Sequence, residues 1–310
     1  MTTINQSIKA IASRVSRIAY RVSKTILHSS FIILHSSLII LHSSLLLSSC
    51  DLLPEPFIRE PEPNDSITVV NRNVLVLEFT GHTCKWCPRA HRMISQMQDL
   101  YDDQLITVSF HLGHFARPES GPAFSSDYRT PEGNILEEYF PFISFPTGTV
   151  NRLDKEALSP YTSWPAEAAQ IVKSESPLLL EAEAQYLPAL GGARLTVTGT
   201  PLANLEGHYK LAAWVTEDHI TDWQKDIDAD PQDVREYQHN HLFRKSAGGV
   251  WGESVGEDKE ILKKGTIFVK EFSLALDPAW RPEHCNWVYF VYRTGTLEVI
   301  QAGTLTMTTR

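Results

Sequence analysis

The chain has 310 residues, which predicts about two domains at the usual size of ~150 residues each. Its 42% hydrophobic and 21% charged residues are typical of a globular protein that buries substantial cores. Residues 1–49 contribute five basic residues and no acidic residue to a net charge of −9, so residues 50–310 carry −14. A surface this acidic repels nucleic acid and excludes that class of partner.

Residues 1–49 are predicted to be a lipoprotein signal peptide. A basic region through Lys24 precedes an apolar stretch over residues 26–47, and Leu47-Ser48-Ser49-Cys50 follows. This tetrapeptide resembles the bacterial lipoprotein processing site, which implies that Cys50 carries the lipid and becomes the first mature residue. The alternative is an uncleaved transmembrane anchor, because the stretch is about long enough to span a bilayer. Paired serines that interrupt it every seven residues argue against an anchor.

Residues 50–65 are predicted to form an extended tether between the lipid and the first domain. Four prolines alternate with acidic residues here, and proline fixes φ while the charges disfavour burial. The first folded domain is then expected over residues 66–176.

The first domain has the pattern of an α/β fold. Residues 74–80 are nearly continuous apolar sequence, typical of a strand buried on both faces, and residues 105–112 form a second such strand. The helix between them opens near Pro88, so the two strands are predicted to be a parallel pair with a right-handed crossover. Further elements are expected as helices near 131–139 and 165–174 and a strand within 143–150.

Cys84 and Cys87 open the predicted helix with two residues between them. Two thiols at this spacing close a disulfide reversibly, and the helix end lowers the thiol pKa through its partial positive charge. We expect Cys84 to be the more exposed sulfur, with Lys85 and Arg89 adding cationic character. The alternative is a permanent disulfide that only stiffens the turn of an exported protein.

The order of these elements resembles the thioredoxin superfamily, in which a buried strand, a Cys-x-x-Cys helix start and a later hydrophobic-Pro-Thr step recur. The resemblance implies that Pro146 is a cis proline lying against the disulfide. It also implies that Glu78, six residues before Cys84, takes the proton of Cys87. A bound peptide is then expected to meet three residues: Trp86, Phe145 and Thr147.

A metal site is the competing interpretation of the same region. His82, Cys84, Cys87 and His91 lie within ten residues, and thiolate with imidazole suits zinc or copper. The parallel strands also bring His111 and His114 to this sheet edge. Because His82 and His91 flank a helix start and oxidation removes the thiolate ligands, we expect solvated histidines, no metal and no cofactor.

Residues 177–310 are predicted to be an all-β domain, an immunoglobulin-like antiparallel sandwich. Six strands are expected, with a helical pattern only near residues 231–241 and a long ordered connection over residues 217–264. The strands are expected over residues 178–187, 193–200, 208–216, 265–276, 287–292 and 298–307.

The long connection contains four polar residues that suit two roles: His239, Asn240, His241 and Arg244. They could bind a ligand or metal, or they could form hydrogen bonds with buried backbone groups of the connection. We favour the second, structural role. Cys285 has no evident partner and is predicted to be a buried free thiol.

Two further motifs carry a second resemblance. Trp214-Val215-Thr216-Glu217-Asp218 and Tyr237-x-His239-Asn240-His241-x-x-Arg244, together with the processing site, resemble the outer membrane protein family typified by the twenty-eight-kilodalton lipoprotein of Bacteroidetes. The resemblance covers about residues 66–310 and implies an outer membrane lipoprotein of the bacterial envelope, held on the membrane through Cys50.

Two functions therefore stand as hypotheses. One is an envelope thiol–disulfide oxidoreductase that uses Cys84 and Cys87 on envelope or secreted proteins. The other is a binding, adhesin-like or receptor-like lipoprotein that uses the thioredoxin-like domain only as a scaffold.

Overall fold

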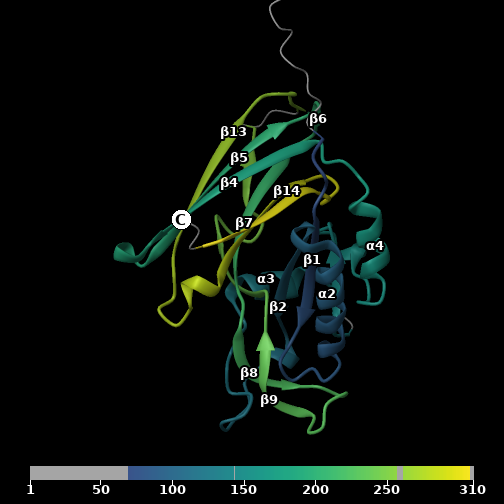
Figure 1. The fold of residues 1–310 in the computed structure, drawn as a ribbon, viewed down its shortest axis with the longest axis vertical. Helices are drawn as coiled ribbons and strands as arrows, with labels where there is room; N and C mark the ends of the chain where they lie inside the picture. Colours follow the sequence, from purple (N-terminus) through teal and green to yellow (C-terminus); the bar gives the residue numbers. More distant parts are fainter. Residues whose placement is uncertain (1–68, 143, 257–260, 308–310) are drawn as a thin grey trace, which may run out of the picture. The chain divides into compact units, whose positions relative to one another are not determined.

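The structure is a computed structural model that describes residues 69–142, 144–256 and 261–307. The predicted signal peptide, Cys50 and the tether lie outside these residues. Residues 67–310 form one compact unit of mixed α/β structure with several sheets (Figure 1). Among the described residues, no helix is long and apolar enough to cross a membrane.

The predicted parallel strand pair is confirmed. β1 (Val74–Thr80) and β2 (Leu105–His111) pair in parallel over their whole length, and both are buried at every residue. β3 (Thr147–Val150) pairs antiparallel with the other edge of β1. β3 is shorter than expected, because residues 144–146 precede the strand.

Three helices follow from local sequence signals. α2 (Cys87–Tyr101) buries Ala90, Ile94 and Met97 against Val74 and Val76 of β1, as three- and four-residue spacing predicts. α3 (Pro131–Tyr139) begins with Pro131, and the Thr130 side chain accepts a hydrogen bond from the Gly133 N–H at 3.0 Å. α4 (Trp164–Ile171) closes the first half.

The second half of the described chain is almost entirely strands and tight turns. All six strands predicted from alternation are present, as β4, β5, β7, β13, β14 and β15. The strands are β4 (Leu178–Leu187), β5 (Gly192–Pro201), β6 (Leu205–Glu206), β7 (Tyr209–Glu217), β8 (Ile220–Lys225), β9 (Asp233–His239), β10 (Leu242–Ala247), β11 (Glu253–Val255), β12 (Ile261–Leu262), β13 (Phe268–Ala275), β14 (Cys285–Arg293) and β15 (Val299–Thr306).

Short 3-10 helices connect several of these elements. They are η1 (Asp102–Gln104), η2 (His114–Ala116), η3 (Lys155–Ala157), η4 (Pro188–Leu190) and η5 (Pro282–His284).

One sheet runs through both halves of the chain, in the order β15-β14-β7-β10-β2-β1-β3, with β11 also paired to β7. The join lies between β10 and β2, where Leu242 pairs with Ser109 and the Ser109 N–H donates to the His241 carbonyl at 2.8 Å. The division predicted at residues 176 and 177 therefore does not separate two sheets. One core also spans the join, where the rings of Phe110 and Phe243 lie 4.4 Å apart.

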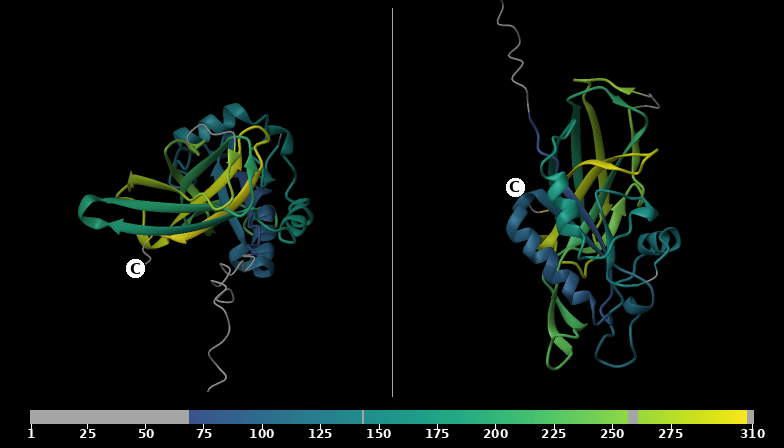
Figure 2. Two further views of the ribbon diagram at one scale, coloured as in Figure 1. Left: turned by 90° about the horizontal axis from the view of Figure 1, so that it is seen from above. Right: turned by 90° about the vertical axis from the view of Figure 1, so that its right-hand side faces the viewer.

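A three-stranded sheet, β13-β5-β4, forms a second layer over the strands of the second half. Leu195 and Val197 of β5 pack with Leu211 of β7 and Trp287 of β14 in one buried cluster. This is sandwich packing of two sheets, but one of its layers is the sheet shared with β1 and β2. Figure 2 shows the paired β4 and β5 extending as an arm beyond the other strands.

The helix predicted near residues 231–241 is wrong, because this segment forms strand β9, which pairs antiparallel with β8. The ladder shifts register between Asp222 and Gln224, so that Tyr237 pairs with Asp222 and Val234 with Gln224. This irregularity turns Val234 and Tyr237, three residues apart, toward the protein. A bulged strand thereby acquires the apolar spacing of a helix.

Candidate functional site

The two cysteines form a disulfide at the start of α2. Cys84 ends a turn in which its N–H donates to the Gly81 carbonyl at 3.0 Å, and Cys87 is the first residue of the helix. Pro88 follows in the first turn, where a missing N–H leaves no hydrogen bond unmade. The sequence prediction of a Cys-x-x-Cys pair at a helix start is confirmed.

The turn before Cys84 packs against the segment that follows β2. The Phe115 carbonyl accepts hydrogen bonds from both the N–H and the hydroxyl of Thr83, at 3.0 and 2.9 Å. A Cβ at Gly81 would lie 2.5 Å from the Phe115 carbonyl carbon, so residue 81 must be glycine for this approach.

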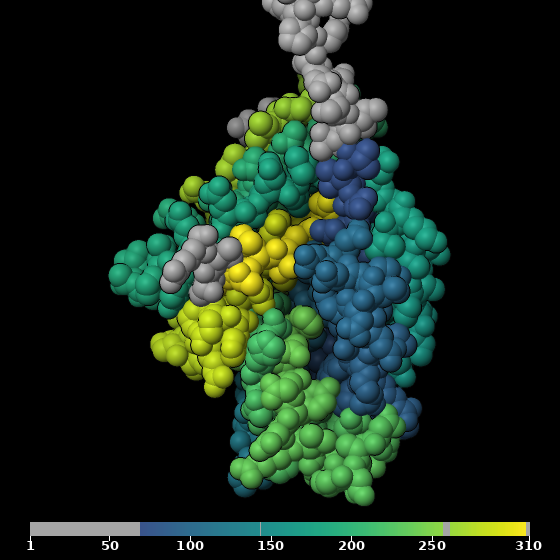
Figure 3. All heavy atoms as spheres, in the orientation of Figure 1, coloured from purple at the N-terminus to yellow at the C-terminus, as the bar shows by residue number. Residues whose placement is uncertain are grey.

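Both cysteines are buried, with Cys84 2% exposed and Cys87 0%. Cys84 is the more exposed of the two, as expected, but by a small margin. A segment far along the chain, the β8–β9 hairpin, binds the turn that carries Cys84. Figure 3 shows this hairpin (green) lying against α2 (blue).

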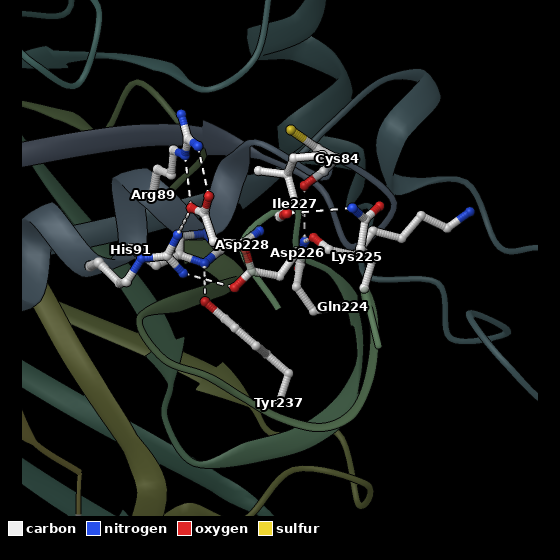
Figure 4. A network of polar contacts seen from close by, with 11 residues as sticks. Cys84, Arg89, His91, Gln224, Lys225, Asp226, Ile227, Asp228 and Tyr237 are labelled. Atoms are coloured by element: carbon white, nitrogen blue, oxygen red, sulfur yellow. Dashed lines mark hydrogen bonds and ion pairs between the residues drawn. The ribbon is translucent and has the colours of Figure 1, made fainter. Parts of the chain in front are cut away.

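Main-chain and side-chain hydrogen bonds attach the hairpin to the cysteine turn. The Lys225 N–H donates to the His82 carbonyl and the Ile227 N–H donates to the Lys85 carbonyl, both at 2.9 Å. The buried Gln224 side chain donates to the Cys84 carbonyl at 3.1 Å, as Figure 4 shows. The segment that flanks Cys84 is thus bound by an extended strand of the same chain.

Ion pairs extend this attachment along α2. Arg89 donates to both carboxylate oxygens of Asp228 at 2.8 and 2.6 Å, and Arg92 bridges Asp226 and Asp228. The Arg89 guanidinium also lies 4.6 Å from the centroid of the Trp86 ring, which is 45% exposed. Arg89 was expected to place positive charge near Cys84. Its guanidinium is paired with the carboxylate of Asp228 on the hairpin.

Glu78 lies on β1, fully buried, on the face that α2 covers. The Ser109 hydroxyl donates to its Oε2 at 2.7 Å, and His91 Nε2 lies 3.1 Å from its Oε1. His91 Nδ1 is 2.6 Å from the Tyr237 hydroxyl on β9. Sequence reasoning selected Glu78 for this site but placed Tyr237 only in the family motif, because Tyr237 and His91 are 146 positions apart in the chain.

The Phe145–Pro146 peptide bond is cis, as the thioredoxin resemblance implies. The Phe145 ring lies 5.7 Å from the Phe115 ring, and Phe115 accepts the hydrogen bonds from Thr83 beside Cys84. The Thr147 hydroxyl donates to the Ser159 carbonyl at 3.2 Å. Phe115 thus connects the proline segment with the cysteine turn.

A group of buried imidazoles lies next to this region. The His111 ring is 6.1 Å from that of His82 and 5.4 Å from that of His239, with Tyr128 packed against all three. Burial lowers the pKa of each histidine, to about 3 for His239, so the rings stay neutral. In the part of the chain that the structure describes, no group of three or more His, Cys, Asp or Glu is arranged to hold a metal ion.

The polar residues of the long connection satisfy neighbouring groups. Asn240 accepts from the His219 N–H, the His241 N–H donates to Asp218, and Arg244 donates to Glu217 at 2.8 Å. His239 Nε2 lies 3.3 Å from the Trp223 carbonyl. These contacts agree with the structural role favoured from sequence. Cys285 is a buried free thiol, as predicted.

A cleft of 320 Å³ opens between α2 and the end of the hairpin. Glu78 and His91 both line it. The other lining residues are Ile94, Ser95, Gln98, Ser109, His111, Asp218, His219, Gln238, His239, Asn240 and His241.

Comparison with known proteins gives a family and a related fold. The sequence model of the family described as outer membrane protein Omp28 matches residues 134–308, a stretch that begins after the two cysteines. No curated protein sequence matches the chain.

Three solved structures are similar to the described fold. HBP35 of Porphyromonas gingivalis has a TM-score of 0.57 and 17% identity, over 77% of this chain and 76% of that chain. A protein from Agrobacterium tumefaciens has a TM-score of 0.46 and 11% identity, over 76% and 96%. A domain of the outer membrane lipoprotein Omp28 from Porphyromonas gingivalis has a TM-score of 0.29 and 18% identity, over 43% and 88%.

Proposed function

Because the chain belongs to the Omp28 family of outer membrane proteins, we propose that it is an outer membrane lipoprotein whose Cys84–Cys87 pair exchanges disulfides with envelope or secreted proteins. The family confirms the outer membrane location predicted from sequence. Lipidation at Cys50 belongs to the proposal, since Cys50 lies outside the described residues.

The disulfide at the start of α2 is the observation that carries the exchange proposal, and the buried Glu78 lies on the strand face that α2 covers. The parallel β1–β2 pair, the covering helix and the cis Pro146 support a thioredoxin-like first half. The sheet β13-β5-β4 supports an immunoglobulin-like packing of the second half, which shares its other layer with the first. In this proposal Trp86, Phe145 and Thr147 contact the client peptide.

The proposed exchange is reversible and balances as two thiol–disulfide steps. A client thiolate attacks Cys84 Sγ, the S–S bond breaks, and the electron pair goes to Cys87 Sγ, which takes a proton from Glu78. A second client thiolate attacks the client sulfur of the mixed disulfide and releases Cys84 as a thiolate. The client is oxidised by two electrons and the Cys84–Cys87 pair is reduced; a client disulfide runs the same steps backwards.

One observation favours a second function, a binding, adhesin-like or receptor-like lipoprotein without turnover. Both cysteines are buried, which leaves an attacking thiolate little access to Cys84. In that function the disulfide fixes the turn to which the hairpin binds, and Trp86 is an exposed contact for a partner.

The two functions are separated by assaying residues 67–310 for reduction of insulin disulfides and for refolding of a scrambled protein. The matched control is the Cys84→Ser variant, which keeps Cys87 and the hairpin contacts of the main chain. Activity in either assay above this control supports exchange. Activity equal to the control in both assays rejects exchange and leaves the binding function.

A Cys87→Ser variant expressed in cells tests for a client directly. Without Cys87 to resolve it, a mixed disulfide between Cys84 and the client persists and can be isolated under non-reducing conditions. An envelope protein bound through Cys84, and released by reductant, would identify the client class.

A further inference from the structure

The β4–β5 arm ends in a tip that has no charged side chain. β4 and β5 supply the two sides of this tip, and η4 supplies its turn. Figure 2 shows that the arm carries the tip beyond the other strands. The tip is the run Tyr186-Leu187-Pro188-Ala189-Leu190-Gly191-Gly192-Ala193.

Main-chain hydrogen bonds hold the tip in one conformation. The Gly191 N–H donates to the Pro188 carbonyl at 3.1 Å, and Gly191 has φ +58°, which glycine adopts without strain. The end of β13 joins the tip, since the Leu276 N–H donates to the Gly191 carbonyl at 2.9 Å. Because hydrogen-bonded main-chain groups leave water at lower cost than free ones, this tip suits an apolar environment.

The tip presents a leucine and a tyrosine to solvent. Leu190 is 78% exposed and Tyr186 is 36% exposed. Ala182 and Ala184 of β4 pack on the core of the second half, and alternation along the strand puts Tyr186 on the same face. Tyr186 is nevertheless exposed, because the arm continues past the strands on which the two alanines pack.

Charged residues surround the base of the tip. They are Glu183 on β4, Arg194 on β5 and Asp277 after β13, all of them exposed. Arg194 pairs with Gln185 across the ladder, and two uncharged residue pairs lie between this pair and the turn. At the rise of a strand these two pairs extend about 7 Å. This length matches the ~5–10 Å to which apolar segments enter the boundary between lipid headgroups and acyl chains.

A lipid bilayer fits this tip better than a protein partner does. A projecting apolar turn needs a partner that closes around it, and a bilayer does so without a shaped pocket. Tyrosine is frequent at membrane interfaces, where its ring is buried and its hydroxyl stays among the headgroups. The chain also belongs to a family of outer membrane proteins, so a membrane is at hand.

We propose that residues 186–193 insert into the headgroup region of the outer membrane and hold the folded unit against it in a fixed orientation. The attraction is apolar, because residues 50–310 carry a net charge of −14 and the tip itself carries none. A lipid at Cys50 keeps the chain near the membrane but does not orient it, and the arm supplies the second contact. This role does not depend on whether the disulfide exchanges.

The first test places a reporter on the tip. Residues 67–310 form one compact unit without the predicted signal peptide, so their binding reports on the fold. Leu190→Cys is labelled with a polarity-sensitive fluorophore and titrated with phosphatidylcholine vesicles, then with phosphatidylethanolamine and phosphatidylglycerol vesicles. We expect a blue shift with both. The matched control is Leu100→Cys on α2, at a residue that is 70% exposed, and should show no shift.

The second test removes the apolar contact. Leu190→Asp should lower the vesicle partition coefficient of unlabelled residues 67–310 by at least about tenfold in flotation, because a charge replaces a buried leucine. Leu100→Asp makes the same change at an exposed site away from the arm and should bind as the parent does. Raising NaCl from about 0.05 to about 0.5 M should change the parent's partition by less than about twofold.

Several outcomes overturn the proposal: no binding of the parent to either vesicle, equal binding of Leu190→Asp and the parent, or equal shifts at both labelled positions. A shift that appears with detergent-solubilised outer membrane proteins but not with vesicles also overturns it, because the tip then binds protein. Dithiothreitol should reduce the Cys84–Cys87 pair equally fast in Leu190→Asp and the parent. Failure of disulfide exchange and failure of membrane insertion are therefore separate results.

Discussion

The side-chain amide of Gln224 donates a hydrogen bond to the carbonyl of Cys84 at 3.1 Å, although the two residues are 140 positions apart. The same amide also bonds the Gly81 carbonyl at 3.3 Å. Gln224 is completely buried, so its hydrogen bonds have no competing water. This one side chain connects the hairpin to both ends of the turn that leads into the disulfide.

Replacing Gln224 with alanine should loosen the attachment of the hairpin to the turn that carries Cys84. The Gly81 and Cys84 carbonyls each lose one of their two donors, and the two lost hydrogen bonds cost about 0.5–1.5 kcal/mol of stability each. If reduction of Cys84 proceeds through the displaced hairpin, dithiothreitol should reduce the pair about tenfold faster for each ~1.4 kcal/mol of lost attachment. Trapping of free thiols at timed intervals, with mass spectrometry of the peptide around Cys84, measures the rate.

Gln238→Ala is the matched control for this prediction. Gln238 lies on the same hairpin, is exposed and donates to the Thr221 hydroxyl, so its loss should leave the reduction rate unchanged. Equal rates in the Gln224→Ala and parent proteins would show that the reductant reaches Cys84 without movement of the hairpin.

Because its imidazoles are buried, the protein should have a free energy of unfolding that depends on pH. Burial lowers the pKa of His239 from 6.5 to about 3, so the unfolded chain binds a proton between these values that the folded chain does not. The free energy of unfolding is therefore fully retained above about pH 6.5 and falls as the pH drops toward about 3, by at most about 1.4 kcal/mol per pH unit for this residue. Urea titrations at a series of pH values measure the slope.

In His239→Phe this slope should decrease, because the phenyl ring keeps the aromatic contacts with His111 and Tyr128 but binds no proton. His114→Gln, at an exposed position, should keep the slope of the parent. An unchanged slope in His239→Phe would mean that His239 is protonated alike in the folded and unfolded chains.

Cys285 should be unreactive in the folded protein. It is fully buried, and burial raises the pKa of its thiol to about 12, so almost no thiolate exists at neutral pH. In residues 67–310 with the Cys84–Cys87 disulfide intact, iodoacetamide should label Cys285 only after denaturation. Labelling of the native protein at the rate of the denatured one would contradict the burial.

Gly148 on β3 should not tolerate a methyl group. A Cβ there would lie 2.2 Å from the Leu77 carbonyl oxygen and 2.6 Å from the ring of the buried Trp164, so β3 must move away from β1. We expect Gly148→Ala to cost about 1–3 kcal/mol by thermal or urea unfolding. Gly295→Ala, where no atom lies within 4 Å of the new Cβ, should change stability by no more than about 0.5 kcal/mol.

Local sequence patterns predicted most of the elements because each pattern reflects one physical period. The apolar run of β1 indicated burial on both faces, and the spacing of Ala90, Ile94 and Met97 indicated the buried face of α2. β9 was missed for the same reason: its bulge gives Val234 and Tyr237 the spacing of a helix. The spacing of apolar residues shows which side chains face inward. It does not show whether a helix or a bulged strand places them there.

The candidate site was predicted only where its residues are close in the chain. Cys84, Cys87 and Glu78 lie within one strand–turn–helix unit, so spacing and family resemblance together located them. Gln224 and Asp228 carry no local signal of a role, and Tyr237 was placed only in a family motif, because the partners of all three on the cysteine turn and α2 are more than a hundred positions away. Their role appears only when β8 and β9 are paired and placed.

The sequence alone determined the oxidisable Cys84–Cys87 pair, the parallel strand pair before and after its helix, and the outer membrane character of the chain. Local period, turn chemistry and motif spacing are sufficient for these features. Only the tertiary structure decided that β10 pairs with β2, so that both halves share one sheet, and that the β8–β9 hairpin binds the turn that carries Cys84. Both features depend on hydrogen bonds between segments far apart in the chain. Main-chain donors and acceptors are the same in every residue except proline. The amino-acid sequence therefore contains no local pattern that predicts which distant segments will pair.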